Sequence, residues 1–440
     1  MKKVLVDSSE ELNNFIKLYN DKNSIIFSII ENNSLVLLFF YIDMEGYYLI
    51  PVNLHDMENI KDISFLKNSN KKKLIFNKRE FLKLGLEIDN IYDIYSLYYL
   101  YNLNFINNEL DFQLLLNNSL IGRDKSLLSL VSVYNYFDYF EKILEGINKN
   151  ILINLLNNNL YEINNFDRFI KSFNEIEKNG LYVDRNLFKK YFNVELNRDI
   201  VYSKYNLYNF TGRPGNICEG INLNSLKKNN NERSFLISRF RDKGKLLLLD
   251  YDAYHFRLVS KLIKYSFPKN VYIYEYLGKK YFGKDKINSE EYKKIKGDLF
   301  KILYSKTINN YTNIDFFKET LEFIDKLFNE YNKNGYINSV IFKRKLYFNN
   351  IERMNKYLLF NYYIQNYETE NNLIVIENIN KFLKRYESKL IMYNFDSFLI
   401  DYKEEENILN DLKEIIERDN FLVKSYLGNN FNKMEKINNN

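Results

Sequence analysis

The stretch KLLLLDYDAYHFR, residues 245–257, decides how the second half of the chain folds. Four consecutive leucines stand directly before Asp250, and aromatic and polar residues follow it. A short apolar run that ends at polar residues is typical of a buried strand, and the sequence from about residue 254 onward predicts a helix. The sequence therefore predicts an ordered strand that ends in a carboxylate.

A second apolar strand runs into an aspartate much later in the chain. The segment KLIMYNFDSFLIDY, residues 389–402, predicts a hairpin with Asp396 at its turn. If the strands that carry Asp250 and Asp396 are neighbours in one sheet, their carboxylates converge and can hold two Mg²⁺ ions, which prefer oxygen ligands and a substrate phosphate. Two-metal sites stabilise the attacking and leaving oxygens of an in-line displacement. The alternative is that each aspartate is only a turn residue.

Residues 289–304 predict a long helix with three functional candidates on one face. Lys296, Phe300 and Tyr304 recur every four residues, so they share one helical stripe. Such a stripe offers a cation for phosphates, a ring for a base or sugar, and a phenol beside a base pair. The alternative is that both rings belong to the core and that Lys296 only extends its charge to solvent.

Composition limits the class of protein. A chain of 440 residues with 46% apolar and 27% charged residues predicts a folded, soluble protein of more than one domain. Its single cysteine, Cys218, excludes an internal disulfide and a cysteine-rich zinc site, which favours the cytoplasm. The start lacks a signal peptide, and the longest apolar run, residues 35–42, is too short to span a membrane. The net charge of +6 agrees with a polyanionic partner.

The order of strand and helix patterns predicts two domains. Residues 24–51 contain three short β-rich runs separated by turn residues, which predict an antiparallel meander. Helical patterns follow at 91–103 and 126–144, so we expect a first domain over residues 1–145 and a second over 146–440.

The first part of the second domain, before the strand at 245, is predicted to contain one helix and one sharp turn. The helical pattern over 146–180 ends at Gly180, a plausible C-terminal cap. Residues 185–210 predict a short, polar, irregular link. The segment FTGRPGN, residues 210–216, concentrates glycine and proline and predicts a rigid turn of functional interest.

Together these features resemble family A DNA polymerases of the bacterial DNA polymerase I type, especially shortened phage-encoded members, over residues 166–435. The resemblance implies an α/β (α+β) fold with a palm at about 166–264 and 346–440 and fingers at about 265–345. It implies an enzyme that adds dNTPs to a primer 3′-OH with two Mg²⁺ ions, and primer-template DNA as partner. We expect a monomer, a processivity factor as a further partner, and the host cytoplasm if the chain is phage-encoded.

The resemblance assigns residues to the catalytic and nucleotide sites. DYDAYHFR (250–257) is similar to the first palm motif, and NFDSF (394–398) to the second, so Asp250 and Asp396 become the catalytic metal ligands. KIKGDLFKILY (294–304) is similar to the fingers helix. This similarity implies that Lys296 meets the triphosphate and that Phe300 and Tyr304 lie beside the incoming nucleotide.

The resemblance also assigns residues to DNA. TGR (211–213) and GINLN (220–224) are similar to a DNA-contact stretch, FNYYIQNYE (360–368) to a helix that faces the template and minor groove, and GLYVD (180–184) to the segment before the thumb. The implied DNA-binding residues are Arg213, Asn222, Asn224, Arg257 on the primer side, Asn361 and Gln365.

The chain departs from the family pattern at the nucleotide site. His255 stands where the family usually has a glutamate that closes over the sugar and excludes a 2′-hydroxyl. Tyr292 stands where an arginine usually meets the phosphates, and Ser305 replaces a glycine, which predicts weaker triphosphate binding. His255 and Tyr292 remain candidate nucleotide-binding residues.

The second palm motif departs from the family as well. It reads Phe395-Asp396-Ser397 in place of His-Asp-Glu, so a third carboxylate would have to come from Asp252 or Asp401.

Two further departures concern whole domains. Only 26 residues separate Asp184 from Thr211, which predicts a reduced or absent thumb and low processivity. Residues 1–145 resemble an RNase H-like 3′–5′ exonuclease domain by strand order and by YNYFD (134–138). The expected Asp-x-Glu of its first strand reads Ser28-Ile29-Ile30, and the nearby acids do not restore it: Glu31, Glu80, Asp93 and Asp138. We therefore expect an inactive scaffold.

Two rival hypotheses remain open at this point. His255, Tyr292 and the short link are also compatible with a non-catalytic DNA-binding replication factor on a degenerate polymerase fold. The same residues leave open an enzyme that uses ribonucleotides or that acts in translesion synthesis or repair.

Overall fold

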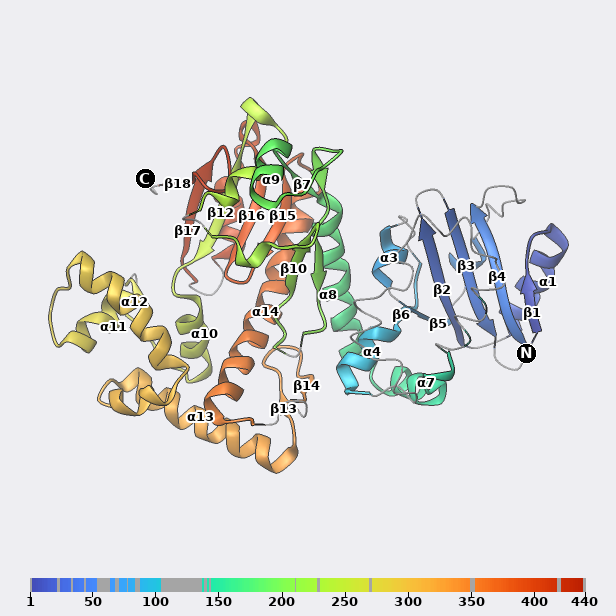
Figure 1. Cartoon of the computed structure of the whole chain (residues 1–440). Helices are drawn as coiled ribbons and strands as arrows, with labels where there is room; N and C mark the ends of the chain where they lie inside the picture. The colour runs from blue at the N-terminus through green and yellow to red at the C-terminus, as the bar shows by residue number, and fades with distance from the viewer. Residues whose placement is uncertain are drawn as a thin grey trace. The chain divides into compact units, whose positions relative to one another are not determined.

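The computed structural model divides into two compact units, Met1–Asn174 and Glu175–Asn440, which are described separately (Figure 1). The structure describes residues 2–21, 24–32, 35–42, 45–53, 64–67, 71–76, 78–83, 88–103, 137, 141, 144–209, 211–227, 230–268, 271–348, 353–417 and 421–437. The expected domain division near residue 145 stays a prediction.

The first unit is built on a six-stranded sheet of order β1-β4-β3-β2-β5-β6. Its strands are β1 (Lys2–Leu5), β2 (Ser24–Asn32), β3 (Leu35–Ile42), β4 (Gly46–Asn53), β5 (Lys72–Ile75) and β6 (Ile91–Asp93). Strands β2, β3 and β4 pair antiparallel, which confirms the predicted meander. Strand β1 joins β4 in parallel, and β5 and β6 extend the sheet in parallel from β2.

Helices cover this sheet and complete its core. They are α1 (Ser9–Asp21), α2 (Ser64–Lys67), α3 (Lys78–Lys83), α4 (Ile94–Tyr101) and α7 (Lys149–Asn158). Helix α1 buries Phe15 and Tyr19, and the Phe15 ring lies 4.9 Å from that of Phe40 on β3.

The predicted helix at 91–103 begins only at Ile94. Residues Ile91–Asp93 instead pair with β5, and Asp93 caps the helix by accepting a hydrogen bond from Ser96 N. The helix expected at 126–144 falls almost entirely outside the described residues.

Helix α8 (Leu160–Asn179) leads into the second unit and ends where the sequence predicts. Gly180 has φ +63° and follows the last helical residue. A Cβ added at Gly180 would lie 2.7 Å from Ile200 Cγ2, so this cap requires glycine for its conformation and for its close packing.

The second unit contains a five-stranded antiparallel sheet of order β15-β16-β12-β17-β18. Its strands are β12 (Gly244–Tyr251), β15 (Lys389–Asn394), β16 (Ser397–Lys403), β17 (Val423–Gly428) and β18 (Glu435–Lys436). The predicted strand at 245–250 is therefore the central strand, and the predicted hairpin at 389–402 is confirmed as β15 and β16.

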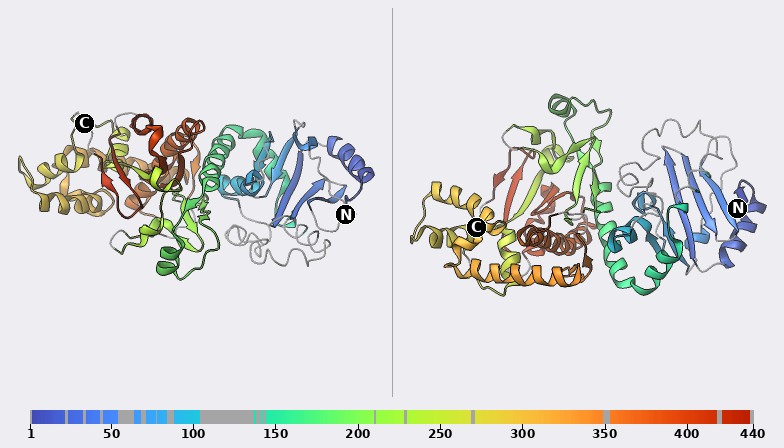
Figure 2. Two further views of the ribbon diagram at one scale, coloured as in Figure 1. Left: turned by 90° about the horizontal axis from the view of Figure 1, so that it is seen from above. Right: turned by 60° about the horizontal axis from the view of Figure 1, so that its bottom comes forward.

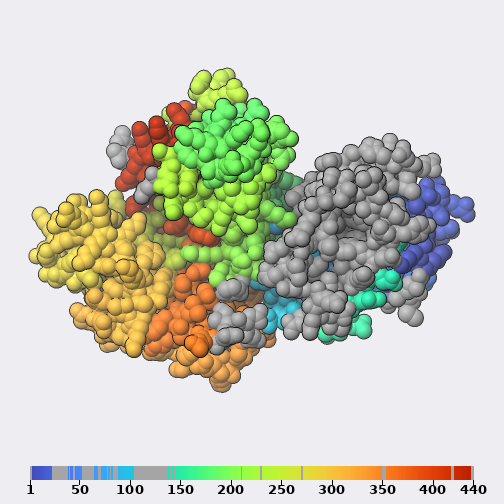
Figure 3. Space-filling view, viewed as in Figure 1, coloured from blue at the N-terminus to red at the C-terminus, as the bar shows by residue number. Residues whose placement is uncertain are grey.

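Strand β12 is buried on both faces. Its four leucines, Leu246–Leu249, are all buried, and successive side chains of a strand point to opposite faces. Leu246 and Leu248 pack against apolar residues of the segment 181–236. In Figure 3 this segment, coloured green, lies next to the red atoms of the C-terminal part of the chain.

The segment 185–210 is more ordered than the sequence predicts. It contains α9 (Arg185–Phe192), β8 (Ile200–Val201) and β9 (Lys204–Asn206), so the expectation of an irregular link was wrong. Asp184 caps helix α9, which buries Phe188 and packs Leu187 and Phe192 against the same core. Neighbouring short elements are β7 (Leu181–Tyr182), β10 (Gly215–Cys218), β11 (Ile221–Asn222), η1 (Leu223–Ser225), η2 (Glu232–Phe235) and η3 (Arg241–Lys243).

The remaining helices of the second unit build a helical lobe and support the sheet (Figure 2). They are α10 (Tyr254–Leu262), α11 (Ile273–Phe282), α12 (Ser289–Leu303), η4 (Lys306–Tyr311), α13 (Asp315–Asn334), α14 (Lys356–Leu383), η5 (Glu404–Glu406) and α15 (Leu409–Ile416), with a small ribbon of β13 (Ile337–Asn338) and β14 (Lys345–Leu346). Helix α14 contacts α10, α13, α15 and β15, so it links the helical lobe to the sheet. In the described part of the chain, no helix combines the length and apolar character that crossing a membrane requires.

The buried centre of β12 predicts a measurable cavity effect. Leu249→Ala should lower the free energy of unfolding by about 2–5 kcal/mol in a denaturant titration, because Leu249 is fully buried. As a control, Ile217→Ala should cost about 1 kcal/mol or less, because Ile217 on β10 is 50% exposed. Equal losses in the two variants would contradict the central position of β12.

Candidate active site

Two aspartates lie at one end of the five-stranded sheet. Asp250 on β12 pairs in register with Ser397 on β16, and Asp396 directly precedes Ser397. The backbone N–H of Tyr251 donates to the carbonyl of Asp396 at 3.0 Å, which ties the hairpin turn to the end of β12. The structure therefore brings together the two predicted catalytic residues.

The turn that carries Asp396 is held from several sides. Phe395 adopts a left-handed conformation with φ +56°, which costs a non-glycine residue about 1–2 kcal/mol. Its carbonyl accepts a hydrogen bond from Asn372 Nδ2 at 2.6 Å, and Asn394 Oδ1 accepts one from Asn224 Nδ2 at 2.8 Å. These bonds from α14 and η1 fix the turn.

The environment of Asp396 favours a bound cation. Part of this residue faces solvent, while the protein around its carboxyl group removes much of its hydration. This desolvation, with repulsion from the nearby Glu368 carboxylate, raises the pKa of Asp396. A cation beside Asp250 and Asp396 would relieve both effects, so the two carboxylates fit Mg²⁺ as ligands.

A third carboxylate does not join this pair. Asp401, which the sequence offered as a candidate, lies opposite Leu246, four residues along β12 from Asp250, or about 13 Å. It is buried and accepts a hydrogen bond from Arg239 Nε at 2.7 Å, so that expectation was wrong.

Asp252, the other candidate, is neutralised by ion pairs with Lys424 and Arg257. Within the described ranges, no group of three or more His, Cys, Asp or Glu side chains is arranged to hold a metal ion.

Helix α12 presents its predicted stripe next to α11. Lys296 is exposed, and its Nζ lies 5.7 Å from the centroid of the Tyr274 ring on α11. The Phe300 ring lies 6.3 Å from Tyr274, and the Tyr292 ring 6.5 Å from it. Desolvation and the charges of Asp252, Asp396 and Asp250 raise the pKa of Tyr274. Nothing in the sequence singles out Tyr274 as the ring beside the α12 stripe.

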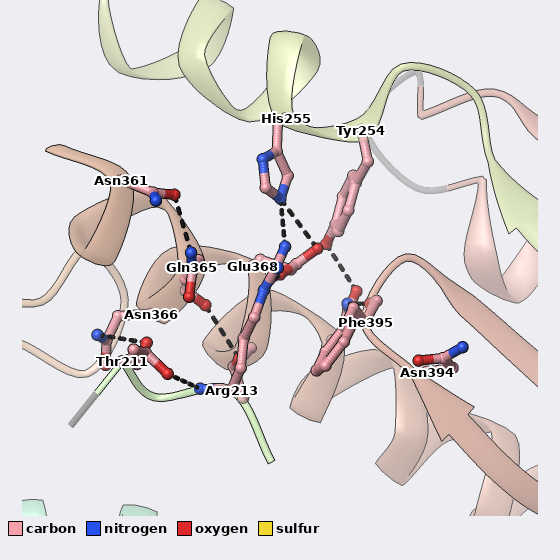
Figure 4. Close-up of polar contacts among 12 residues, drawn as sticks. Thr211, Arg213, Tyr254, His255, Asn361, Gln365, Asn366, Glu368, Asn394 and Phe395 are labelled. Atoms are coloured by element: carbon pink, nitrogen blue, oxygen red, sulfur yellow. Dashed lines mark hydrogen bonds and ion pairs between the residues drawn. The ribbon is translucent and has the colours of Figure 1, made fainter. Parts of the chain in front are cut away.

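His255 contacts a buried carboxylate that the sequence did not single out, and Tyr304 contacts His255 in turn. Glu368 on α14 is fully buried, and its Oε2 accepts a hydrogen bond from Arg213 Nε at 2.6 Å (Figure 4). Its Oε1 lies 3.1 Å from His255 Nε2, and the Tyr304 hydroxyl bonds the other ring nitrogen of His255. Burial by itself would raise the pKa of Glu368, but Arg213 and His255 lower it below its ordinary value. The carboxylate is therefore ionised.

A signal for Glu368 was available in the sequence. It stands three residues after Gln365 in the quoted segment 360–368, so on a helix the two residues lie on adjacent positions of one face. No residue around it, however, indicates a cationic partner, because Arg213 lies 155 positions away.

A glycine turn delivers Arg213 to this cluster. Gly212 has φ +77°, and a Cβ there would lie only 2.4 Å from Asn366 Oδ1. Asn366 Nδ2 donates to the carbonyl of Thr211 at 3.0 Å, which docks the turn on α14. The predicted rigid turn therefore positions the positively charged side chain of Arg213.

The other predicted DNA-binding residues differ in their surroundings. Asn361 and Gln365 are half-buried on α14, and Gln365 Nε2 donates to Asn361 Oδ1 at 2.8 Å. Asn222 and Asn224 hydrogen-bond each other in the cap of η1, and Arg257 Nε donates to the Asp252 carbonyl at 2.8 Å. The structure thus brings Arg213 to Glu368 and Asn224 to the turn before Asp396, while Asn222 caps η1 and Arg257 bonds the Asp252 carbonyl.

Comparisons with known proteins bear on this geometry. No protein-family model matches the chain, and no curated protein matches it. Among solved structures, it is similar to the POL domain of Pol1 from M. smegmatis in complex with DNA primer-template and dNTP, with a TM-score of 0.67, 11% identity, and coverage of 98% of this chain and 99% of that chain. The chain has the fold of a DNA polymerase I polymerase domain. This confirms the resemblance at the level of the fold.

The docking of the glycine turn is testable. Gly212→Ala should lower the free energy of unfolding by about 1–3 kcal/mol more than Gly283→Ala, because overpacking adds to the backbone cost only at Gly212. Gly283 is the matched control, since its φ of +62° is also left-handed and nothing lies within 4 Å of an added Cβ. Equal losses in a denaturant titration would show that the close approach to Asn366 does not matter.

Proposed function

We propose that the protein is a template-directed DNA polymerase that adds dNTPs to a primer 3′-OH, in replication or repair. The observation that carries the proposal is the pairing of β12 with β16, which sets Asp250 beside Asp396. The fold shared with a polymerase domain solved with primer-template and dNTP supports the same activity.

The proposed reaction is a nucleotidyl transfer. The primer 3′-oxygen forms a bond to the α-phosphorus of the dNTP, the bond to the bridging oxygen breaks, and pyrophosphate leaves. Asp250 and Asp396 would hold two Mg²⁺ ions, which supply charge neutralisation to the attacking and leaving oxygens.

The other site residues bind and orient the incoming nucleotide in this proposal. Lys296 meets the triphosphate, Phe300 and Tyr304 lie beside the nucleotide, and Tyr292 and His255 complete its surroundings. Positioning and electrostatic stabilisation supply most of the acceleration in phosphoryl transfer.

The charge distribution supports DNA as the partner. Residues 185–245 contain 13 Lys and Arg but five Asp and Glu, an excess that is larger than the net charge of +6 of the whole chain. We propose that this basic segment, defined as residues 185–245, binds DNA phosphates and stands in place of a full thumb. Helix α9, at eight residues, is its one α-helix in the described ranges, which supports a reduced thumb. Arg213, Asn361 and Gln365 are the proposed groove-side contacts.

We also propose that the first unit is a catalytically inactive RNase H-like exonuclease domain. An antiparallel meander followed by two strands parallel to its first strand supports this topology. Ser28, Ile29 and Ile30 occupy β2, where the resemblance expects two acids. Asp93 accepts hydrogen bonds from Lys78 N and Ser96 N, which gives it a structural role, and Asp138 lies outside the described residues.

Primer extension tests the central proposal. With Mg²⁺, the wild-type protein should extend a primed template, and Asp250→Asn and Asp396→Asn should each slow extension by at least about 100-fold, because each removes charge from the transition-state site. The matched control is Asp411→Asn, an exposed position on α15, which should keep wild-type rates. If the wild-type protein binds duplex but never extends it, the rival of a non-catalytic DNA-binding factor is favoured.

Salt dependence tests the basic segment. The affinity for primed duplex, measured by fluorescence anisotropy between 50 and 200 mM salt, should fall by about 10-fold or more if several phosphates are contacted. Lys190→Ala and Lys243→Ala, both exposed in this segment, should each lower the salt slope by about one. Lys326→Ala, exposed on α13, serves as the control. An equal effect of all three would contradict the proposal.

A further inference from the structure

A lysine stands beside Asp250 in the five-stranded sheet. Lys424 on β17 pairs in register with Asp250, on the side of β12 opposite to the pairing with Ser397. Directly opposed residues of antiparallel strands carry their side chains on the same face of a sheet, with Cβ atoms about 5 Å apart. Lys424 therefore extends a cation from the face and the end of the sheet that carry the Asp250 carboxylate.

Lys424 belongs to an ion-pair cluster that has one more cation than carboxylate. Its Nζ bonds the carboxylate of Asp252, whose side chain is only 1% exposed. Arg257 NH2 lies 3.6 Å from Oδ2 of the same carboxylate. The Lys424 side chain is 24% exposed and that of Arg257 is 12% exposed, so Lys424 is the cation of this cluster that a dissolved anion reaches more readily.

Arg257 allows Lys424 to change partners. A buried carboxylate that loses its only cation is strongly destabilised. Asp252 faces two cations, and Arg257 is anchored to it because its Nε donates to the Asp252 carbonyl at 2.8 Å. The carboxylate therefore stays paired when Lys424 turns away, and a lysine suits this movement because its ammonium is a compact charge on a flexible stem.

Lys424 also faces the helical lobe. Its Nζ lies 5.9 Å from the centroid of the ring of Tyr272, which is half exposed and directly precedes α11. The ring of Tyr274, two residues further on, has the Nζ of Lys296 at 5.7 Å from its centroid. Two lysines, one from β17 and one from α12, therefore approach the first residues of α11.

We propose that Lys424 is a phosphate-binding residue that exchanges its bond to Asp252 for the triphosphate of the incoming nucleotide. This inference rests on the proposed polymerase function. Lysine binds phosphate oxygens as a point charge, and the cluster retains Arg257 as the partner of Asp252. The place of Lys424 between Asp250 and the start of α11 favours the nucleotide over the phosphates of the DNA backbone, which offer the same chemistry and which the test distinguishes.

Single-nucleotide incorporation on saturating primed duplex tests the assignment. Lys424→Met keeps the stem and removes the charge, so KM for the dNTP should rise about tenfold or more, the effect of losing a hydrogen bond between charged groups. The value of kcat should change less than about threefold, because the lost contact is made equally to substrate and transition state. Lys424→Arg keeps the charge and should hold KM within about threefold of wild type.

Inorganic tripolyphosphate supplies a readout that needs no catalysis. In a calorimetric titration with Mg²⁺ and primed duplex present, it should bind the wild-type protein about tenfold more tightly than Lys424→Met. The affinity for primed duplex alone, measured by fluorescence anisotropy, should agree between the two proteins within about twofold. A fall in duplex affinity with unchanged KM would assign Lys424 to the DNA backbone and overturn the proposal.

Lys403→Met is the matched control. Lys403 is also a half-buried, ion-paired lysine of this sheet, with its Nζ 2.6 Å from Glu387, but it lies opposite Gly244 at the other end of β12. Its loss should change neither KM for the dNTP nor the binding of tripolyphosphate. Equal effects of Lys403→Met and Lys424→Met would overturn the proposal, because a general loss of positive charge would explain both.

The double variant K424M/D252N separates phosphate binding from a structural role. If Lys424 only neutralises Asp252, removing both charges restores the wild-type KM and overturns the proposal. If Lys424 binds phosphate, KM stays raised about tenfold in the double variant, which also replaces Lys424→Met if circular dichroism shows that the single variant does not fold. A wild-type protein that extends no primer overturns the proposed function, and the tripolyphosphate titration then decides the role of Lys424 by itself.

Discussion

The antiparallel register between β12 and β16 is the constraint on which the site depends. It pairs Asp250 with Ser397 and so places Asp396 at the same end of the sheet. A slip of one residue would move every side chain of β12 to the opposite face and turn Asp250 away from its present side of the sheet. The packing of Leu246 and Leu248 against the segment 181–236 therefore helps to secure the geometry of the carboxylate that follows them.

Sequence patterns predicted the parts of the site that follow local periodicity. The apolar runs before Asp250 and Asp396 indicated strands, and the four-residue spacing of Lys296, Phe300 and Tyr304 indicated one face of a helix. The capping box of Asn288 and Glu291 fixes where that helix begins, so its register follows from the sequence as well.

Contacts between distant segments could not be predicted in the same way. Asp401 has the same chemistry as Asp396, and only the pairing with Leu246 reveals that it lies at the wrong end of the strand. Arg213 and Glu368 lie 155 positions apart, and no local pattern joins them. Helix α9 was missed although Leu187, Phe188 and Phe192 recur at helical spacing, because the helix has only eight residues and polar segments flank it.

Helix α14 explains why the site is difficult to detect from composition. It spans 28 residues, and it buries polar groups alongside apolar ones: Asn366, Glu368, Glu370 and Asn372. These side chains bond segments that are distant in the sequence, namely the turn at Thr211 and Arg213, Arg344, and the Phe395 carbonyl. Ordinary amphipathic helices direct such residues to solvent. On α14 the buried polar residues instead determine which segments pack against the helix.

The left-handed conformation of Phe395 has a consequence for how the candidate site loses its geometry. The orientation of the Asp396 side chain does not depend on the hairpin alone. Asn372 on α14 hydrogen-bonds the Phe395 carbonyl and the Arg213 guanidinium packs on the Phe395 ring, and both contacts restrain the turn. Local openings that cost less than global unfolding are common in proteins. A brief fraying of α14 would therefore release the turn to a relaxed backbone while the sheet stayed intact, and Asp396 would lose its orientation well below the melting temperature.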